Sequence, residues 1–199
     1  NGKDLDQLVV IPYPEEEVTR ESSQAKIKRV KSLLADDSST IELHDLVIDE
    51  VRHFLANTTE DHFKIHGQFS DGELLGRIAK YDELVGDLAS ELACIAYWAK
   101  PMHLAILKKA FARSTDRLDS QGGMVVWLSL RWYPLLILLY CAGIAAVEGN
   151  RYESLASIFY TRLGHAEYGK SSQYLIEVVA KCIAEYNQMG VFRKIPGYD

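Results

Sequence analysis

The chain has 199 residues, of which 48% are hydrophobic and 25% charged, an ordinary composition for a folded globular protein. Its formal net charge of -6 at pH 7 argues against non-specific nucleic-acid binding, which needs a basic surface. The three cysteines, Cys94, Cys141 and Cys182, lie far apart and show no C-x-x-C spacing, which favours reduced, buried thiols over a disulfide framework or a zinc site. We therefore expect a cytoplasmic protein without a cofactor.

The chain begins with a short apolar run rich in β-branched residues. Leu8 to Ile11 predict a short strand, and the segment Pro12-Tyr13-Pro14 continues it in an extended conformation. This is the one convincing strand in the sequence, so it either ends a domain that precedes residue 1 or packs as an arm on the helices. We favour the first alternative, in which residues 1–18 belong to an upstream domain of a larger protein.

The segment from Thr19 to Ala35 is predicted as the first helix, with Thr19 as its N-cap. Its apolar residues recur at helical spacing, at Ile27, Val30, Leu33 and Leu34. The same segment carries four basic residues that spread around its polar face, Lys26, Lys28, Arg29 and Lys31. We interpret them as a solvated helix face rather than a phosphate site.

Two capping boxes predict where the next two helices begin. Ser39 with Glu42 starts a helix that ends near Asn57, and its core stripe is Leu43, Val47, Val51 and Phe54. Ser70 with Glu73 starts the longest helix, over about residues 71–99, which Pro101 closes. Its apolar stripe is spaced by three and four residues throughout: Leu74, Ile78, Tyr81, Val85, Leu88, Leu92 and Ile95.

The most apolar stretch runs over residues 124–147 and is apolar on all sides, so it must be surrounded by other helices or by lipid. Its uncharged part, from Trp132 to Val147, is shorter than the roughly 18–20 residues that span a membrane. Extending it back to Met124 places Arg131 near the middle, where a charge is costly. We expect a buried central helix, divided or kinked at Pro134.

Three more helices complete the prediction. One begins near Met102, one follows a turn with Gly149 at C′ and Asn150 as the next N-cap, and one is capped by Ser171 or Ser172 and stopped by Gly190. The sequence therefore predicts an all-α, multi-helix bundle. Residues 19–190 form a single helical domain around the central helix, and residues 191–199 form a tail.

The segment Leu138 to Phe159 resembles one tetratricopeptide-type helical hairpin. The matching residues are Leu139, Tyr140, Gly143 and Ala146 on the first helix, the turn Gly-Asn-Arg-Tyr, and Leu155-Ala156 on the second. The resemblance implies an antiparallel helix pair in which small residues allow close approach and the turn aromatic packs between the helices. A second copy one period away is missing from the sequence, so no repeat array is expected.

Two histidine patterns are candidates for a metal site. Glu50 and His53 form the E-x-x-H pair found in di-iron bundles, but a second pair is missing and this one lies opposite the apolar stripe, so we expect it in solvent. His62 and His66 would bind zinc together only on a helix, and the intervening residues favour a loop. We therefore predict no metal-binding, cofactor-binding or catalytic residue.

Two features remain as candidate sites. The inter-helix segment from residue 160 to 170 concentrates polar and aromatic side chains, at Arg162, His165, Glu167, Tyr168 and Lys170, and loops on a rigid scaffold often bind ligands. The second feature is Arg131, which lies within the most apolar stretch, beside a carbonyl that Pro134 deprives of its donor. A buried guanidinium needs a carboxylate partner, which we expect on the long helix at Asp82, Asp87 or Glu91.

We predict a helical scaffold or protein-interaction domain that forms the C-terminal part of a larger multidomain cytoplasmic protein. Its partner would be another domain of the same polypeptide or a separate protein, with neither nucleic acid nor membrane as a ligand, and a homo-oligomer is compatible with this prediction. The alternative is a pocket-forming helical lobe of an enzyme whose active-site domain lies outside this chain. In that case Arg131 and the loop over residues 160–170 would contribute to the pocket.

Overall fold

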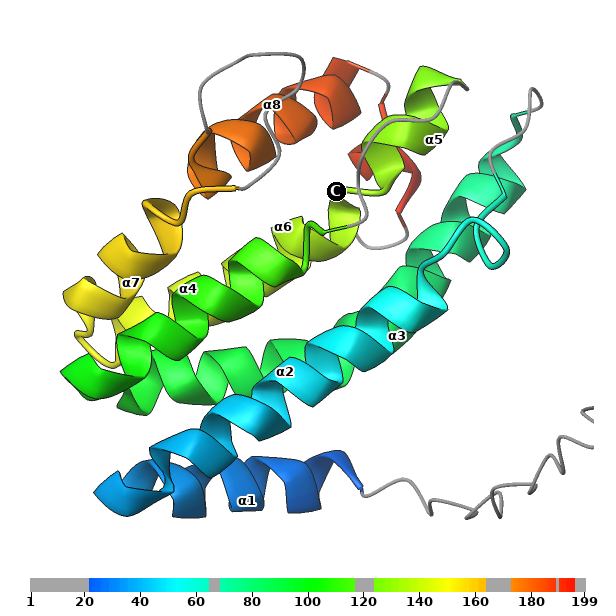
Figure 1. The fold of residues 1–199 in the computed structure, drawn as a ribbon. Helices are drawn as coiled ribbons and strands as arrows, with labels where there is room; N and C mark the ends of the chain where they lie inside the picture. The colour runs from blue at the N-terminus through cyan, green and yellow to red at the C-terminus, as the bar shows by residue number, and fades with distance from the viewer. Residues whose placement is uncertain (1–21, 65–68, 117–123, 164–172, 189, 196–199) are drawn as a thin grey trace, which may run out of the picture.

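The computed structural model describes residues 22–64, 69–116, 124–163, 173–188 and 190–195, and in these ranges the fold is all-α (Figure 1). The helices are α1 (Ser23–Ala35), α2 (Thr40–Asn57), α3 (Asp71–Trp98), α4 (Leu104–Arg113), α5 (Val125–Leu130), α6 (Tyr133–Glu148), α7 (Tyr152–Phe159) and α8 (Leu175–Gln188). Short 3-10 turns are η1 (Asp37–Ser39), η2 (Pro101–His103) and η4 (Phe192–Lys194). The predicted all-α bundle is confirmed, and the expected strand at Leu8 to Ile11 lies outside the described residues.

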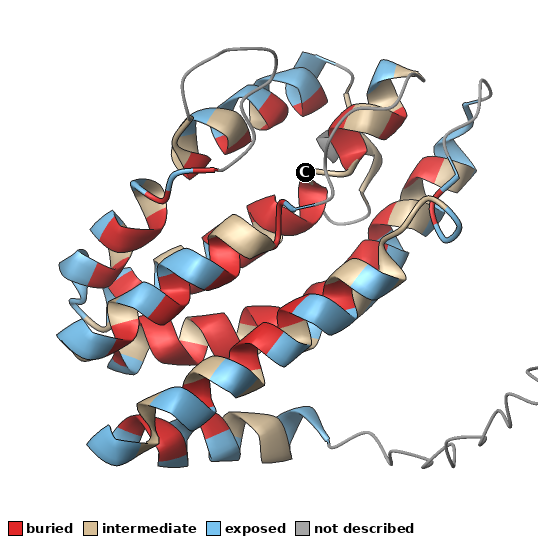
Figure 2. Ribbon diagram, in the orientation of Figure 1, coloured by how far each residue is buried: buried red, intermediate tan, exposed pale blue. Residues whose placement is uncertain are grey.

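The centre of the bundle is the packing of α3 against α6, which share the most extensive contact in the structure. Every residue of the predicted α3 stripe, from Leu74 to Ile95, is buried (Figure 2). From α6, buried positions recur at three- and four-residue spacing at Leu135, Leu138, Ala142 and Ala146. Burying a leucine side chain fully contributes about 1.5–3 kcal/mol, so this pair of helices supplies much of the stability.

The other helices pack around that pair. Helices α1 and α2 pack on α3, whereas α7 and α8 pack on α6, and α4 lies against α2 and α7 (Figure 1). Residues 191–199 were expected as a tail, but the described part, 191–195, packs against the helices. Val191 is buried, and Lys194 forms an ion pair of 2.5 Å with Asp71 at the start of α3.

The central apolar segment is divided as predicted. Helix α5 ends at Leu130 and α6 begins at Tyr133, with Pro134 in the first turn, where a missing N–H has no intrahelical partner to lose. By length and composition, Val125–Glu148 is apolar enough to cross a membrane, with a mean hydropathy of 1.7 and half of the window buried in the protein. Within this segment α6 packs most extensively on α3, and one stripe of α6 remains open to solvent.

Of the two predicted N-cap hydroxyls, one forms the expected hydrogen bond and the other does not. The hydroxyl of Ser70 accepts a hydrogen bond from the Glu73 N–H at 3.2 Å, as predicted. Ser39 makes no cap hydrogen bond. Instead the carboxylate of Asp36 accepts from the N–H and hydroxyl of Ser38, because η1 inserts a turn before α2 begins. At the first helix Ser22 is the cap, through the N–H of Ala25.

In the turn between α6 and α7, the left-handed residue lies one position later in the chain than predicted. Asn150, not Gly149, adopts the left-handed conformation, with φ 54. The Arg151 N–H donates to the Ala146 carbonyl at 2.7 Å and the Asn150 N–H to Val147 at 3.0 Å, the pattern of a Schellman motif. Gly149 is needed for another reason, since a Cβ there would lie 3.0 Å from the Tyr97 carbonyl oxygen.

Candidate functional site

An apolar groove with a volume of about 460 Å³ lies between α6, α7 and α8. Helix α6 forms one wall through Tyr140, Ile144 and Val147, which are 55%, 65% and 51% exposed. The short helix α7 adds Leu155 and Phe159, and α8 forms the facing wall with Ile176, Ala180 and Ile183. A contiguous exposed apolar surface of this kind marks a binding surface more often than scattered single residues do.

The groove exists because α6 has more apolar surface than its neighbours cover. Tyr140, Ile144 and Val147 stand at i, i+4 and i+7, so they form one stripe along the helix. Helix α7 has eight residues against sixteen in α6, and it cannot cover that stripe along its length. Sequence inspection missed these residues. The signal that could have found them is the short length of the helix after Asn150.

The electrostatics of the groove are simple, because Glu148 is the one charged residue among the described residues that line it. Glu148 ends α6, whose last turn has no basic residue. The carbonyl end of a helix carries a partial negative charge, so the carboxylate adds to a negative field at this end of the groove. Within the described residues Glu148 has no ion-pair partner, and one end of an otherwise uncharged groove is therefore negative.

The base of the predicted binding loop lies directly beyond the groove residues Phe159 and Ile176. Arg162 pairs with Tyr174 in an isolated antiparallel bridge, and its guanidinium donates to the Tyr174 hydroxyl at 3.2 Å. The ring of Tyr160 meets that of Tyr174 edge to face, with centroids 5.6 Å apart. His165, Glu167, Tyr168 and Lys170 lie outside the described residues, so the predicted binding role of the loop stays a prediction.

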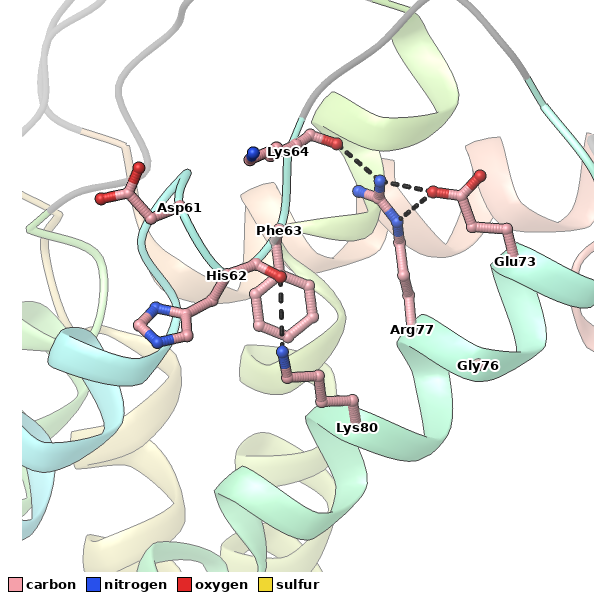
Figure 3. A pocket seen from close by; sticks show the side chains of 8 residues that line it. All are labelled: Asp61, His62, Phe63, Lys64, Glu73, Gly76, Arg77 and Lys80. Atoms are coloured by element: carbon pink, nitrogen blue, oxygen red, sulfur yellow. Dashed lines mark hydrogen bonds and ion pairs between the residues drawn. The ribbon is translucent and has the colours of Figure 1, made fainter.

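A second, polar pocket of about 460 Å³ lies between the segment after α2 and the start of α3 (Figure 3). The Arg77 guanidinium donates to the Lys64 carbonyl at 2.5 Å and to the Glu73 carboxylate at 2.6 Å. It also lies over the ring of Trp127, 4.1 Å from the centroid. The Lys80 ammonium donates to the His62 carbonyl at 3.4 Å.

These contacts fasten the segment after α2 to α3. The Phe63 ring stacks on that of Tyr81 with centroids 4.1 Å apart, and the Lys80 ammonium lies over the Phe63 ring, 4.7 Å from its centroid. Burial raises the pKa of Tyr81 to about 12, so its hydroxyl stays neutral at physiological pH. Because the two cations of α3 that line this pocket, Arg77 and Lys80, are both engaged within the protein, we interpret the pocket as an anchor for the chain.

Arg131 pairs with a carboxylate, but the predicted partners were wrong. Its Nη2 lies 3.7 Å from Oε1 of Glu60, with the two side chains 13% and 41% exposed. Asp82 accepts a hydrogen bond from the Tyr133 hydroxyl at 3.0 Å, and Asp87 is engaged by α1. The break between α5 and α6 places Arg131 where the guanidinium meets the segment after α2, a long-range contact that helical spacing does not reveal.

The E-x-x-H pair was expected in solvent, but its Glu50 is largely buried. The ammonium of Lys26 lies 2.7 Å from Glu50 Oε2 and 2.9 Å from Asp87 Oδ2, with side chains only 14%, 10% and 14% exposed. Lys26 thus joins α1 to both α2 and α3, so one of the four basic residues assigned to a solvated face is nearly buried. His53 is exposed and contacts Asn57.

No metal site emerges from the described ranges, in which His, Cys, Asp and Glu side chains form no cluster of three or more suited to an ion. His62 contacts the hydroxyl of Thr59 at 2.9 Å, and His66 lies outside those ranges.

The comparisons with known proteins identify no relative: no family model matches the chain, and neither does any curated protein or solved structure.

Proposed function

We propose that this chain is a helical protein-interaction domain that binds its partner through the groove between α6, α7 and α8. The observation that carries the proposal is the stripe of Tyr140, Ile144 and Val147, which is exposed on the most apolar helix of the chain. Exposed large apolar patches are uncommon on monomeric proteins and mark surfaces that another molecule covers.

The chemistry of the groove supports binding over catalysis. Among the described lining residues Glu148 is the one charged group, so this part of the chain supplies no acid and base pair to the groove. The cysteines are poor nucleophiles as well, since burial raises the pKa of the Cys94, Cys141 and Cys182 thiols, the last to about 12. An exposed apolar surface whose described residues supply no reacting group is suited to recognition.

The partner is a protein segment, supplied by another domain of the same polypeptide or by a separate protein. The net charge of -6 and the negative end of the groove at Glu148 disfavour nucleic acid as the occupant. The rest of the bundle serves as a rigid support, because α3 and the network around Lys26 hold the other helices in place.

The experiment is site-specific photo-crosslinking in cells with benzoylphenylalanine at position 144. The matched control is the same amino acid at Ile41, an exposed isoleucine on α2, far from the groove residues in the sequence. We expect protein adducts at position 144 that are missing at position 41. Equal adduct yields at the two positions, or none at 144, would contradict the proposed function.

A further inference from the structure

Among the described residues that line the groove, the side chains able to form hydrogen bonds are those of Tyr140 and Glu148. The walls of the groove are side chains on three helices, whose backbone N–H and C=O groups are already engaged in helical hydrogen bonds. An extended peptide laid in such a groove would bury backbone groups without partners, whereas a helix satisfies its own. Strand addition also needs a free sheet edge, and the described residues form none beyond the bridge at Arg162.

We infer that the occupant of the groove is a single amphipathic α-helix with a basic residue at the end that meets Glu148. This inference rests on the proposed function and goes beyond it, because it specifies the conformation and the charge of the partner segment. The uncharged lining between Tyr140 and Val147 selects an apolar stripe on that helix. The carboxylate of Glu148, together with the carbonyl end of α6, selects the positive charge.

The dimensions of the groove set the length of the occupant. Its α6 wall extends from Leu139 to Glu148, which at 1.5 Å per residue is about 14 Å. A helix that lies along this wall needs roughly ten residues, or almost three turns. Apolar side chains at i, i+3 or i+4, and i+7 would then meet the stripe of Tyr140, Ile144 and Val147.

The test measures binding of fluorescein-labelled model peptides to the full chain by fluorescence anisotropy. The probe is a 14-residue alanine-rich peptide with leucines at i, i+4 and i+7 and a lysine at one end. Three companion peptides carry glutamate in place of the lysine, a central proline, or the same residues in scrambled order. We expect saturable binding of the probe, with affinity at least tenfold weaker for the proline and scrambled peptides.

Protein variants locate that binding. Ile144→Glu should weaken probe binding at least tenfold, whereas the matched control Ile41→Glu should change it less than twofold. Glu148→Lys should reverse the preference between the lysine and glutamate peptides. Circular dichroism and melting midpoints equal to wild type establish that each variant is folded, and Val147→Glu replaces Ile144→Glu if that variant is not.

Equal binding of the proline or scrambled peptide, or no reversal in Glu148→Lys, would overturn the inference. So would groove occupancy by a second copy, seen as dimers in sedimentation that Ile144→Glu abolishes, or binding to phosphatidylcholine vesicles that depends on Ile144. If position 144 crosslinks to another protein while the probe fails to bind, the inference fails and the proposed function stands. If position 144 gives no adducts, the proposed function itself fails.

Discussion

Helices α3 and α6 form the centre of the molecule together, but they use their surfaces differently. Helix α3 has one apolar stripe that is buried along its length and polar faces that bind neighbouring segments through Arg77, Asp82 and Asp87. Helix α6 is apolar on every face, and part of its surface stays open at Ile144. In an amphipathic helix, the apolar stripe determines which face is buried. A helix that is apolar on all sides instead leaves an exposed binding surface wherever its neighbouring helices end.

The largest effect should come from removing core volume on α3. Leu92 is fully buried, so Leu92→Ala should lower the free energy of unfolding by about 3–5 kcal/mol through lost burial and an unfilled cavity. Urea denaturation at neutral pH measures it. A loss below about 1 kcal/mol would show that α3 is not the centre of the core.

The polar flank of α3 should come next. Lys26→Ala removes the ammonium that contacts the carboxylates of both Glu50 and Asp87, and we expect a loss of about 3 kcal/mol, the lower end of the range for breaking a buried pair. Burial lowers the pKa of Lys26, but the hydrogen bonds to both carboxylates raise it more, and the net shift is upward. The stabilisation is therefore complete at neutral pH and is lost only as pH rises above about 10.5.

A triple variant sharpens this prediction. Lys26→Met with Glu50→Gln and Asp87→Asn removes all three charges, and it should restore part of the stability that Lys26→Ala loses. If the triple change is no better than Lys26→Ala, the loss comes from packing of the lysine stem and not from charge.

A smaller, steric effect is expected at Gly149, where the turn after α6 passes close to the end of α3. A methyl group in Gly149→Ala would lie 3.0 Å from the carbonyl oxygen of Tyr97 at the end of α3, and we expect a loss of about 2 kcal/mol. The matched control is Gly143→Ala on the same helix, where the nearest atom of Leu155 is 3.8 Å away. Alanine there should be neutral or stabilising by up to about 1 kcal/mol. Thermal melts compare the two, and equal midpoints would contradict the close approach.

Acid should destabilise the connection after α3, because it favours protonation of His103, which is fully buried. Its Nδ1 accepts from the Lys100 N–H at 3.2 Å, and its Nε2 is buried without a hydrogen bond. Burial lowers its pKa, nearby Lys100 lowers it further, and Asp37 opposes this. The unfolded chain therefore binds a proton more readily, so stability is complete above about pH 6.5 and falls as pH decreases. His103→Asn should reduce the change in the free energy of unfolding between pH 7 and 5. An unchanged pH dependence would mean that other groups cause it.

The smallest effect is expected on the open face of α6. Ile144→Glu should change the free energy of unfolding by no more than about 0.5 kcal/mol, because the side chain is largely in solvent. Denaturation of this variant beside Leu92→Ala tests the contrast between the two helices directly. A loss of several kcal/mol would mean that the groove is closed in solution.

Local patterns in the sequence predicted most of the helices. The stripe from Leu74 to Ile95 and the cap at Ser70 define α3, since a period of three and four residues and a capping hydroxyl are read within one helix. Pro134 likewise predicted the break before α6. The groove was not predicted, and the binding role of the neighbouring loop, which was predicted at Arg162, stays a prediction.

What the sequence determined by itself is where helices lie and which stripe of an amphipathic helix turns inward. Three features were decided by the tertiary structure alone. These are the ion pair of Arg131 with Glu60, the ion pair of Lys26 with Glu50, and the exposed face of α6 at Ile144. Each depends on segments that are distant in the chain, or on the length of a neighbouring helix. On a helix that is apolar all round, periodicity carries no information about which side remains uncovered.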